Sequence, residues 1–318
     1  MFTLVGDLHI KPSNLKEIEN LFKQIEGLKN DVIILGDIFD GKEIIKGRCL
    51  NLLYKLLIHS NLKFTFVVGN HDLYFLREKE HALEVFKSLK NVSIVDSLCL
   101  LNGLYLLPYT HDLNNFRKIL STIPKTCTLI GHQGISGFDY GTGYICNDDL
   151  TTEDFKDFTL VVMGHFHSYQ QKNNIVYLGT PFTHSFGESN TDKYIATLNE
   201  KTNEIKLIPT NFRKHLTLEV DCDILYKDGD NSSSLELEAQ NYYRIILTGA
   251  LINIKRFKKI ESPNIKFIER PDFIKDKSKI SELESPEKQF AMWGKDIKKL
   301  EKEVILEGIK ILQEVANE

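Results

Sequence analysis

The strongest constraint in this sequence is one pattern that occurs five times. A short apolar run rich in β-branched or aromatic residues ends in glycine, and metal-binding side chains follow at once. Such runs predict buried strands, and glycine lets the backbone turn tightly beside a ligand. Ligands gather at the carboxyl ends of strands in open α/β sheets. The five segments are Gly6-Asp7-Leu8-His9, Gly36-Asp37-Ile38-Phe39-Asp40, Gly69-Asn70-His71-Asp72, Gly131-His132-Gln133-Gly134 and Gly164-His165-Phe166-His167.

The candidate ligands in these segments, without His71, are two carboxylates, one amide and four imidazoles. A single segment of this kind is equally well a polar turn, but five at predicted strand ends favour one shared site. The mixed nitrogen and oxygen set suits a pair of borderline metals such as manganese, iron or zinc. The candidate ligands are Asp7, His9, Asp37, Asn70, His132, His165 and His167.

The first ~210 residues alternate predicted strands and helices, which is typical of an α/β fold with a largely parallel sheet. Helical periodicity covers residues 13–28, 43–59 and 78–89. Hairpins are expected at 98–108 and 175–208, with turns at Asn102-Gly103 and Asn199–Asn203. We expect an α/β sandwich of one or two sheets. The predicted strands are Phe2–Gly6, Val32–Gly36, Phe64–Gly69, Val92–Val95, Thr128–Gly131 and Leu160–Gly164.

The composition changes after residue 210, which predicts four parts: 1–210, 211–270, 271–290 and 291–318. The second part holds strands Leu216–Val220, Tyr242–Leu247 and Ile265–Ile268 and a basic helical stretch at 252–260, enough for a small α+β unit. The third part is rich in Lys, Glu, Ser and Pro and predicts a linker. The last part has apolar residues at helical spacing, so a terminal helix either folds back or docks on a partner.

Composition sets wider limits. The 318 residues carry a net charge of −4, and no apolar run is long enough to span a membrane. Five scattered cysteines without a CxxC pair indicate thiols in a reducing compartment. Because the chain starts directly in a strand pattern without a signal peptide, we expect a cytoplasmic protein.

The set DxH, GDxxD, GNHD, GH and GHxH resembles the calcineurin-like metallophosphoesterase superfamily. Within it, GHQG at 131–134 and GTPFTHSFGE at 179–188 are similar to the SbcD nuclease family and its archaeal, eukaryotic and phage counterparts. The similarity covers about residues 1–190 and extends loosely to Tyr242–Gly249. In its compact length and short tail, the chain is most similar to the phage recombination-endonuclease subunits. The resemblance implies a β-sandwich flanked by helices, a small α+β capping domain over 211–270 and a C-terminal helix.

The resemblance also implies residue roles. The first metal site would comprise Asp7, His9, Asp37 and His167, and the second Asp37, Asn70, His132 and His165, with Asp37 bridging. His71 matches the histidine beside the scissile phosphate, and Asp72 would orient it. Asp40 would lie near the substrate, although some family members have histidine there. The two cations would be Mn²⁺, with Mg²⁺ or Zn²⁺ as alternatives.

The implied activity is that of a Mn²⁺-dependent DNA nuclease in recombination and double-strand-break repair, inside a bacterial cell or phage-infected host. It would act as a 3′–5′ exonuclease on duplex ends and an endonuclease on single strands. Its partners would be DNA, a second copy in a homodimer and an SbcC-like coiled-coil ATPase that binds residues 291–318.

Other residues have a substrate-contacting and a plain structural interpretation. Tyr140, in the aromatic loop 134–144, stacks on unpaired bases or packs the loop down. His184 lies at the rim of the site or is an ordinary hydrogen-bonded histidine. A basic run contacts DNA or is a solvated face. That run is Lys255, Arg256, Lys258 and Lys259.

Two alternatives to a nuclease remain. One is a metallophosphoesterase that acts on another phosphodiester or on a phosphoprotein, although Ser/Thr phosphatases of this superfamily usually show GDxVDRG and GNHE where this chain has GDIFDGKE and GNHD. The other is a non-catalytic scaffold of the same fold. Scaffolds typically lose ligands, whereas every expected ligand position is filled here.

Overall fold

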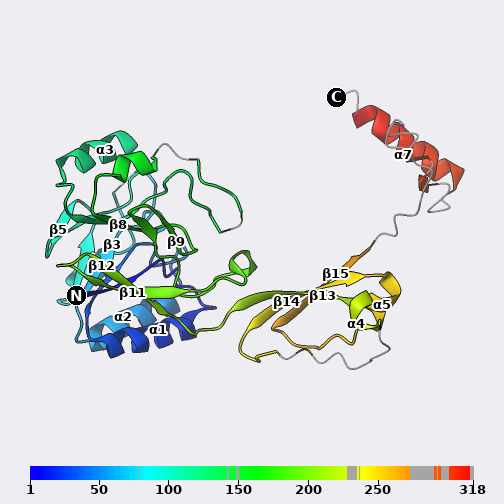
Figure 1. Cartoon of the computed structure of the whole chain (residues 1–318), viewed down its shortest axis with the longest axis horizontal. Helices are drawn as coiled ribbons and strands as arrows, with labels where there is room; N and C mark the ends of the chain where they lie inside the picture. Colours follow the sequence, from blue (N-terminus) through cyan, green and yellow to red (C-terminus); the bar gives the residue numbers. More distant parts are fainter. Residues whose placement is uncertain are drawn as a thin grey trace. The chain divides into compact units, whose positions relative to one another are not determined.

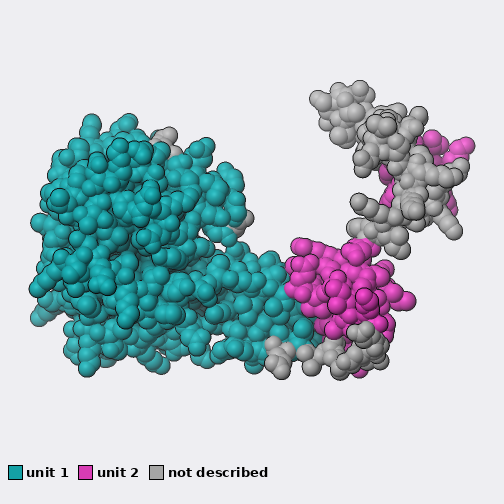
Figure 2. Space-filling model, viewed as in Figure 1, with its two compact units in different colours: residues 1–218, 235–245, 260–267 teal, residues 219–234, 246–259, 268–318 magenta. Residues whose placement is uncertain are grey.

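The computed structural model describes residues 1–77, 79–141, 143–147, 150–227, 235, 237–272, 290–291, 293–294 and 301–315. The chain divides into two compact units (Figure 2). The first comprises Met1–Leu218, Leu235–Ile245 and Ile260–Phe267, and the second Glu219–Ser234, Ile246–Lys259 and Ile268–Glu318. The four-part division expected from composition stays a prediction.

The first unit is built on two six-stranded sheets, so the expected α/β sandwich has two sheets rather than one (Figure 1). The first sheet has the order β12-β11-β1-β2-β3-β4 and the second β5-β6-β7-β8-β10-β9. The first consists of β1 (Phe2–Val5), β2 (Asp31–Ile34), β3 (Phe64–Val67), β4 (Val92–Val95), β11 (Tyr194–Asn199) and β12 (Glu204–Pro209). The second consists of β5 (Cys99–Leu101), β6 (Leu104–Leu107), β7 (Thr128–His132), β8 (Leu160–Gly164), β9 (Gln170–Lys172) and β10 (Ile175–Tyr177).

The second sheet is parallel at the centre and antiparallel at both edges, whereas the first is antiparallel only on the side of β11 and β12. Strands β1 to β4 run parallel in the first sheet, as do β6, β7, β8 and β10 in the second. Hairpins close the edges through β11–β12, β5–β6 and β9–β10. Because the central strands of each sheet are parallel, their carboxyl ends lie along one edge of that sheet.

Alternation along the strands creates three apolar layers. In β2, Val32 and Ile34 belong to the cluster under α1 (Leu15–Leu28) and α2 (Gly47–His59), whereas Ile33 belongs to the cluster shared by both sheets. In β8, Val162 faces that shared cluster and Met163 packs with Phe116 of α3 (Leu113–Thr122). The order is therefore helices, sheet, sheet, helix, with α1 and α2 on the opposite side from α3 (Figure 1).

The predicted helix at 78–89 is wrong. The described part of that stretch holds only the short 3₁₀ helix η1 (Glu84–Ser88). Backbone bonds from Ala82 N to Asp72 O (2.8 Å) and from Tyr74 N to Glu80 O (3.1 Å) fold the segment back onto the GNHD motif. Tertiary pairing thus overrides helical periodicity here.

The two expected turns are present, but the 175–208 hairpin is smaller than predicted. Asn102 and Gly103 both have positive φ, as a two-residue hairpin turn requires. Residues 199–203 connect β11 to β12, whereas Ile175–Tyr177 pairs with β8 and β9. Two further 3₁₀ turns, η2 (Thr152–Phe155) and η3 (Phe186–Glu188), interrupt the connections.

A third sheet has the order β13-β14-β15. It consists of β13 (His215–Asp221), β14 (Tyr242–Gly249) and β15 (Ile265–Pro271), and α4 (Cys222–Leu225) and α5 (Leu251–Arg256) follow its first two strands. The three predicted strands are thus present, and the basic helix is shorter than expected.

The remaining C-terminal element is α7 (Lys302–Val315), which falls within the predicted terminal helix. Most of the predicted linker at 271–290 lies outside the described residues. In the described part of the chain, no helix has both the length and the apolar character that crossing a bilayer requires.

Phe66 of β3 offers a test of this packing, because it is fully buried and its ring lies 6.4 Å from Phe64 and 6.2 Å from Phe86. We expect Phe66→Ala to lower the free energy of unfolding by about 3–5 kcal/mol. Urea denaturation measures the change, and Leu100→Ala, which truncates a side chain 60% exposed, is the control. Equal effects of the two variants would contradict the assigned core.

Candidate metal centre

The seven candidate ligands lie at the carboxyl ends of five parallel strands from both sheets. The first sheet contributes Asp7 and His9 after β1, Asp37 after β2 and Asn70 after β3. The second contributes His132 as the last residue of β7 and the pair His165 and His167 after β8. The structure brings all seven into two neighbouring groups.

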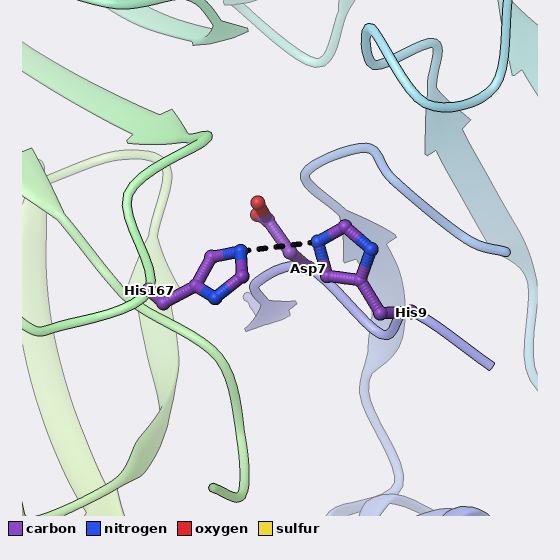
Figure 3. Close-up of side chains that lie close together, drawn as sticks. All are labelled: Asp7, His9 and His167. Atoms are coloured by element: carbon purple, nitrogen blue, oxygen red, sulfur yellow. Dashed lines mark hydrogen bonds between the residues drawn. The ribbon is translucent and has the colours of Figure 1, made fainter. Parts of the chain in front are cut away.

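The first group consists of Asp7, His9 and His167 (Figure 3), whose ligand atoms lie within 4.8 Å of one another. The Nε2 atoms of His9 and His167 are 3.1 Å apart. Two neutral imidazole nitrogens this close need a proton or a cation between their lone pairs. A metal ion that accepts both nitrogens satisfies this geometry.

The second group centres on Asp7, Asp37 and His132, whose ligand atoms also lie within 4.8 Å of one another. The amide oxygen of Asn70 is 3.0 Å from His132 Nε2 and 2.9 Å from His165 Nδ1. An amide oxygen placed between two imidazoles extends this group to the donors expected of a second cation.

Asp37 lies between the two groups. Its Oδ2 is 3.7 Å from His9 Nε2 and 3.5 Å from His132 Nε2, and all three side chains are almost completely buried. Its other oxygen accepts the backbone N–H of His71 at 2.7 Å. Asp37 therefore lies within reach of both groups, and its bridging role stays a prediction.

The electrostatics of the site favour cations. Burial, and next the negative charge of Asp37, raise the pKa of Asp7 well above its usual range. Burial and the neighbouring imidazole of His167 lower the pKa of His9, and burial and His132 lower the pKa of His165 to about 3. Neutral imidazoles keep their lone pairs for a metal, and crowded carboxylates need its positive charge. The donor set therefore fits divalent ions.

Three ligands sit in strained backbone conformations. His9, Asp37 and His165 have φ values of 41°, 50° and 102°, in the left-handed region that non-glycine residues rarely adopt. Each such conformation costs about 1–3 kcal/mol and persists only where the surrounding structure enforces it. Gly69 makes room for this geometry, because a Cβ there would overlap the Asp37 carboxylate.

Other groups hold the ligand rings from behind. His132 Nδ1 lies 2.6 Å from the carbonyl oxygen of Leu35, and His167 Nδ1 lies 2.9 Å from Glu188 Oε1. Burial alone would raise the pKa of Glu188, but the hydrogen bond from His167 and the charge of Lys193 outweigh it and hold that pKa well below its usual range. Sequence reasoning missed these partners, since only the need for an acceptor was foreseeable.

The two predicted catalytic residues behave differently. His71 lies beside the first group, with its ring centre 4.9 Å from that of His9, and its Nδ1 is 3.2 Å from the carbonyl oxygen of Asp40. Asp72 accepts the backbone N–H groups of Gly69, Asp37 and Ile38 at 2.8–2.9 Å. The carbonyl of Asp40, rather than the carboxylate of Asp72, therefore contacts the His71 ring, and Asp72 fixes the two ligand loops.

The residues predicted to contact substrate differ in how exposed they are and in how close they lie to the ligands. His184 is next to the first group, with its ring 5.5 Å from His9 and 5.9 Å from His167, and among the described residues neither ring nitrogen has a hydrogen-bond partner. Tyr140 is partly exposed, packs on Phe166 and lies 6.4 Å from the His165 ring. The carboxylate of Asp40 is exposed and 3.3 Å from Lys11 Nζ.

The basic run belongs to the second unit, and two of its members have local partners. Lys259 pairs with Glu269, and the Arg256 guanidinium lies 4.6 Å from the centre of the Tyr226 ring. Lys255 and Lys258 are exposed. A DNA contact by this run stays a prediction.

A third cluster of potential ligands consists of His81, Glu84 and Asp96, and two of them, His81 and Asp96, line a cavity of about 570 Å³ together with Tyr109 and Arg77. Lys87 Nζ already lies 2.7 Å from Glu84 and 2.8 Å from Asp96. Leu83 N–H donates to His81 Nδ1, so the neutral ring carries its proton on Nε2, the atom a metal would need. The Lys87 ammonium thus already binds both carboxylates of this cluster.

The fold agrees with comparisons to known proteins. The profile of the calcineurin-like phosphoesterase family matches residues 1–169, more than half of the 318 residues. The chain belongs to this family and is a hydrolase of phosphoester bonds, which confirms the predicted superfamily and enzyme class.

Two similar proteins narrow the resemblance. Over 262 residues, 74% of this chain and 73% of the relative, the chain is 25% identical to Exonuclease subunit 1 of Enterobacteria phage T4. Over 340 residues, 91% of this chain and 89% of the relative, it is 25% identical to the DNA double-strand break repair protein Mre11 of Nanoarchaeum equitans (strain Kin4-M). Both agree with the sequence resemblance to the SbcD nuclease family.

Metal binding should stabilise this protein, since the ions would bind the folded state alone. The starting material is protein from which a chelator has removed all metal. We expect Mn²⁺ at ~100 times its Kd to raise the free energy of unfolding of this protein by about 2.7 kcal/mol per site. Asp37→Asn should remove most of that gain, because Asp37 is the carboxylate predicted to bridge both metal sites. Thermal unfolding with and without Mn²⁺ measures it, and Glu43→Gln, which changes an exposed carboxylate in the same connection between β2 and α2, is the control. A full gain in Asp37→Asn would exclude the bridge.

Proposed function

We propose that this chain is a Mn²⁺-dependent DNA nuclease that acts as a 3′–5′ exonuclease on duplex ends and as an endonuclease on single strands. One observation carries the proposal: seven donors from both sheets form two adjoining groups with Asp37 between them. A pair of ions that share a carboxylate can bind one phosphodiester on both. The DNA substrate rests on the similarity to the phage exonuclease subunit and to Mre11.

The metals would be held by Asp7, His9, Asp37 and His167 on one side and by Asp37, Asn70, His132 and His165 on the other. When bound, such ions lower the pKa of water toward ~7 and neutralise charge on the phosphate oxygens. Neutral imidazoles with carboxylates suit manganese, and zinc or magnesium are the alternatives.

His71 is the residue of this chain that we assign to proton transfer. With Nδ1–H donating to the Asp40 carbonyl (3.2 Å), the Nε2 atom is the one free to meet the substrate. A protonated Nε2 beside the scissile phosphate can donate to the leaving 3′ oxygen or to a nonbridging oxygen. The backbone N–H of His71 is anchored on Asp37, which ties this ring to the metal groups.

We also propose the assembly in which the activity operates. The phage relative is named a subunit and Mre11 a repair protein, and both align along most of their length. The terminal helix at 291–318 would bind an SbcC-like coiled-coil ATPase, and the nuclease would form a homodimer. All five cysteines are free, which suits a reducing compartment such as the cytoplasm of a bacterium or an infected host.

The substrate assignment is tested with end-labelled linear duplex DNA, circular single-stranded DNA, a phosphodiester chromogen and a phosphomonoester, each with Mn²⁺. We expect cleavage of both DNA substrates and of the diester chromogen, stimulation by a candidate ATPase partner, and slow turnover of the monoester. If only the monoester or a phosphoprotein is hydrolysed, the nuclease proposal fails and a phosphatase replaces it. A protein that binds two ions but hydrolyses none of the substrates would be a scaffold.

His71→Ala should separate binding from chemistry. We expect this variant to retain Mn²⁺ stabilisation and to cleave DNA about 10²–10⁴-fold more slowly, because it loses the proton donor and no ligand. The matched control is His59→Ala, an exposed histidine at the end of α2. Wild-type cleavage rates in His71→Ala would overturn the assigned role.

A further inference from the structure

A buried ion pair lies directly behind the metal ligand His167. Glu188 Oε2 and Lys193 Nζ are 2.7 Å apart, and their side chains are only 7% and 4% exposed. Burying a charge pair usually contributes little to stability, because desolvation offsets the attraction. The role of this pair is therefore better judged from the groups that it contacts than from its contribution to stability.

Glu188 controls the tautomer of the His167 ring. Its Oε1 lies 2.9 Å from His167 Nδ1, while its Oε2 takes Lys193 Nζ and, at 3.1 Å, the Thr180 hydroxyl. A carboxylate can only accept, so the ring proton must be on Nδ1. The lone pair of Nε2 then faces His9 Nε2 at 3.1 Å, inside the first metal group (Figure 3).

Lys193 controls the main chain of the same ligand. Its ammonium lies 2.7 Å from the carbonyl oxygen of His167, 2.8 Å from the Thr180 hydroxyl and 2.7 Å from Glu188. Three acceptors match the three protons of an ammonium. Thr180 N–H adds a further bond to the His167 carbonyl at 3.0 Å. Ring and backbone of His167 are thus both fixed.

Among the described residues, the imidazole rings of the second metal group have no such carboxylate behind them. His132 Nδ1 donates to a backbone carbonyl, that of Leu35, at 2.6 Å. A carboxylate partner increases the basicity of an imidazole ligand more than a neutral carbonyl does. The two groups are therefore built to bind metal with different strength.

We propose that Glu188 and Lys193 are positioning residues that set the metal affinity of the Asp7–His9–His167 group by fixing the tautomer and backbone of His167, so that this group fills first. The proposal rests on the two-metal site of the proposed function. It assigns a role to the GTPFTHSFGE segment and the lysine that follows, which the hydrolytic chemistry itself leaves unexplained.

Glu188→Gln tests the tautomer step. In this variant the amide oxygen at position 188 would turn to Lys193, and the amide NH₂ would face His167 Nδ1. Because the NH₂ group donates, Nδ1 must accept, and the ring proton moves to Nε2. We expect Mn²⁺ affinity at the first group to fall about 10–100-fold, with the weaker site unchanged. Calorimetric titration of the metal-free protein separates the two sites, and the control is Asp192→Asn, a carboxylate 77% exposed in the same segment.

The imidazole ¹⁵N shifts of His167 give a readout that general destabilisation would not move. They are assigned by their loss in His167→Gln. We expect the Nδ1–H tautomer in the metal-free wild type and the Nε2–H tautomer in Glu188→Gln. An Nε2–H tautomer in the wild type overturns the proposal even if the variant does not fold, as do unchanged affinities in a folded Glu188→Gln.

The role of Lys193 is tested by comparing the single variant Lys193→Met with a double variant. Lys193→Met should leave Glu188 charged and unsupported, so we expect a weaker first site and lower thermal stability. Glu188→Gln with Lys193→Met should recover stability but not first-site affinity. Recovery of both would assign the pair a purely structural role. Wild-type protein that binds two ions in unequal steps yet does not cleave DNA would sink the nuclease proposal and leave this one standing.

Discussion

The structure depends on the close approach of two buried carboxylates, Asp7 and Asp37. Their mutual repulsion and their loss of solvent would be costly in a protein that held nothing between them. Neutral imidazoles surround them on the remaining sides, and these donate lone pairs rather than charge. A proton on Asp7, whose pKa is raised, relieves part of this repulsion, and divalent cations would relieve it while both carboxylates stay charged, so the fold brings together a site suited to metal ions.

The fold positions these groups because the strands that carry them end along the same edge of each sheet. Strand β2 alternates between the helix-covered core and the inter-sheet core until Leu35, and the chain then turns through Gly36 into Asp37 with a positive φ. Rigid strands hold both sides of each such turn, which lets the protein maintain backbone conformations that isolated peptides avoid. The apolar core thus supplies the energy that keeps the ligands strained.

The ligand set was accessible from sequence because each ligand follows a buried strand by only a few residues. Local pattern and local structure agree there. Prediction was wrong at 78–89, where a backbone bond from Ala82 to Asp72 decides the conformation, and periodicity carries no information on such a bond. It also missed the contact between Glu188 and the His167 ring, which joins residues 21 positions apart. Contacts of that kind depend on the path by which a loop comes back to the site, and the periodicity of strands and helices carries no information on that path.

The division of the ligands between the two sheets has a mechanical consequence. The first sheet carries Asp7, His9, Asp37 and Asn70, and the second carries His132, His165 and His167, so bound ions would clasp the open end of the sandwich. Each ion would take ligands from both sheets, so the distance across each ligand set depends on the thickness of the apolar layer between the sheets, to which Ile33, Val67 and Val162 belong. A methyl group gained or lost in that layer, far from any phosphate, would change how tightly the two sheets' ligands close on each ion.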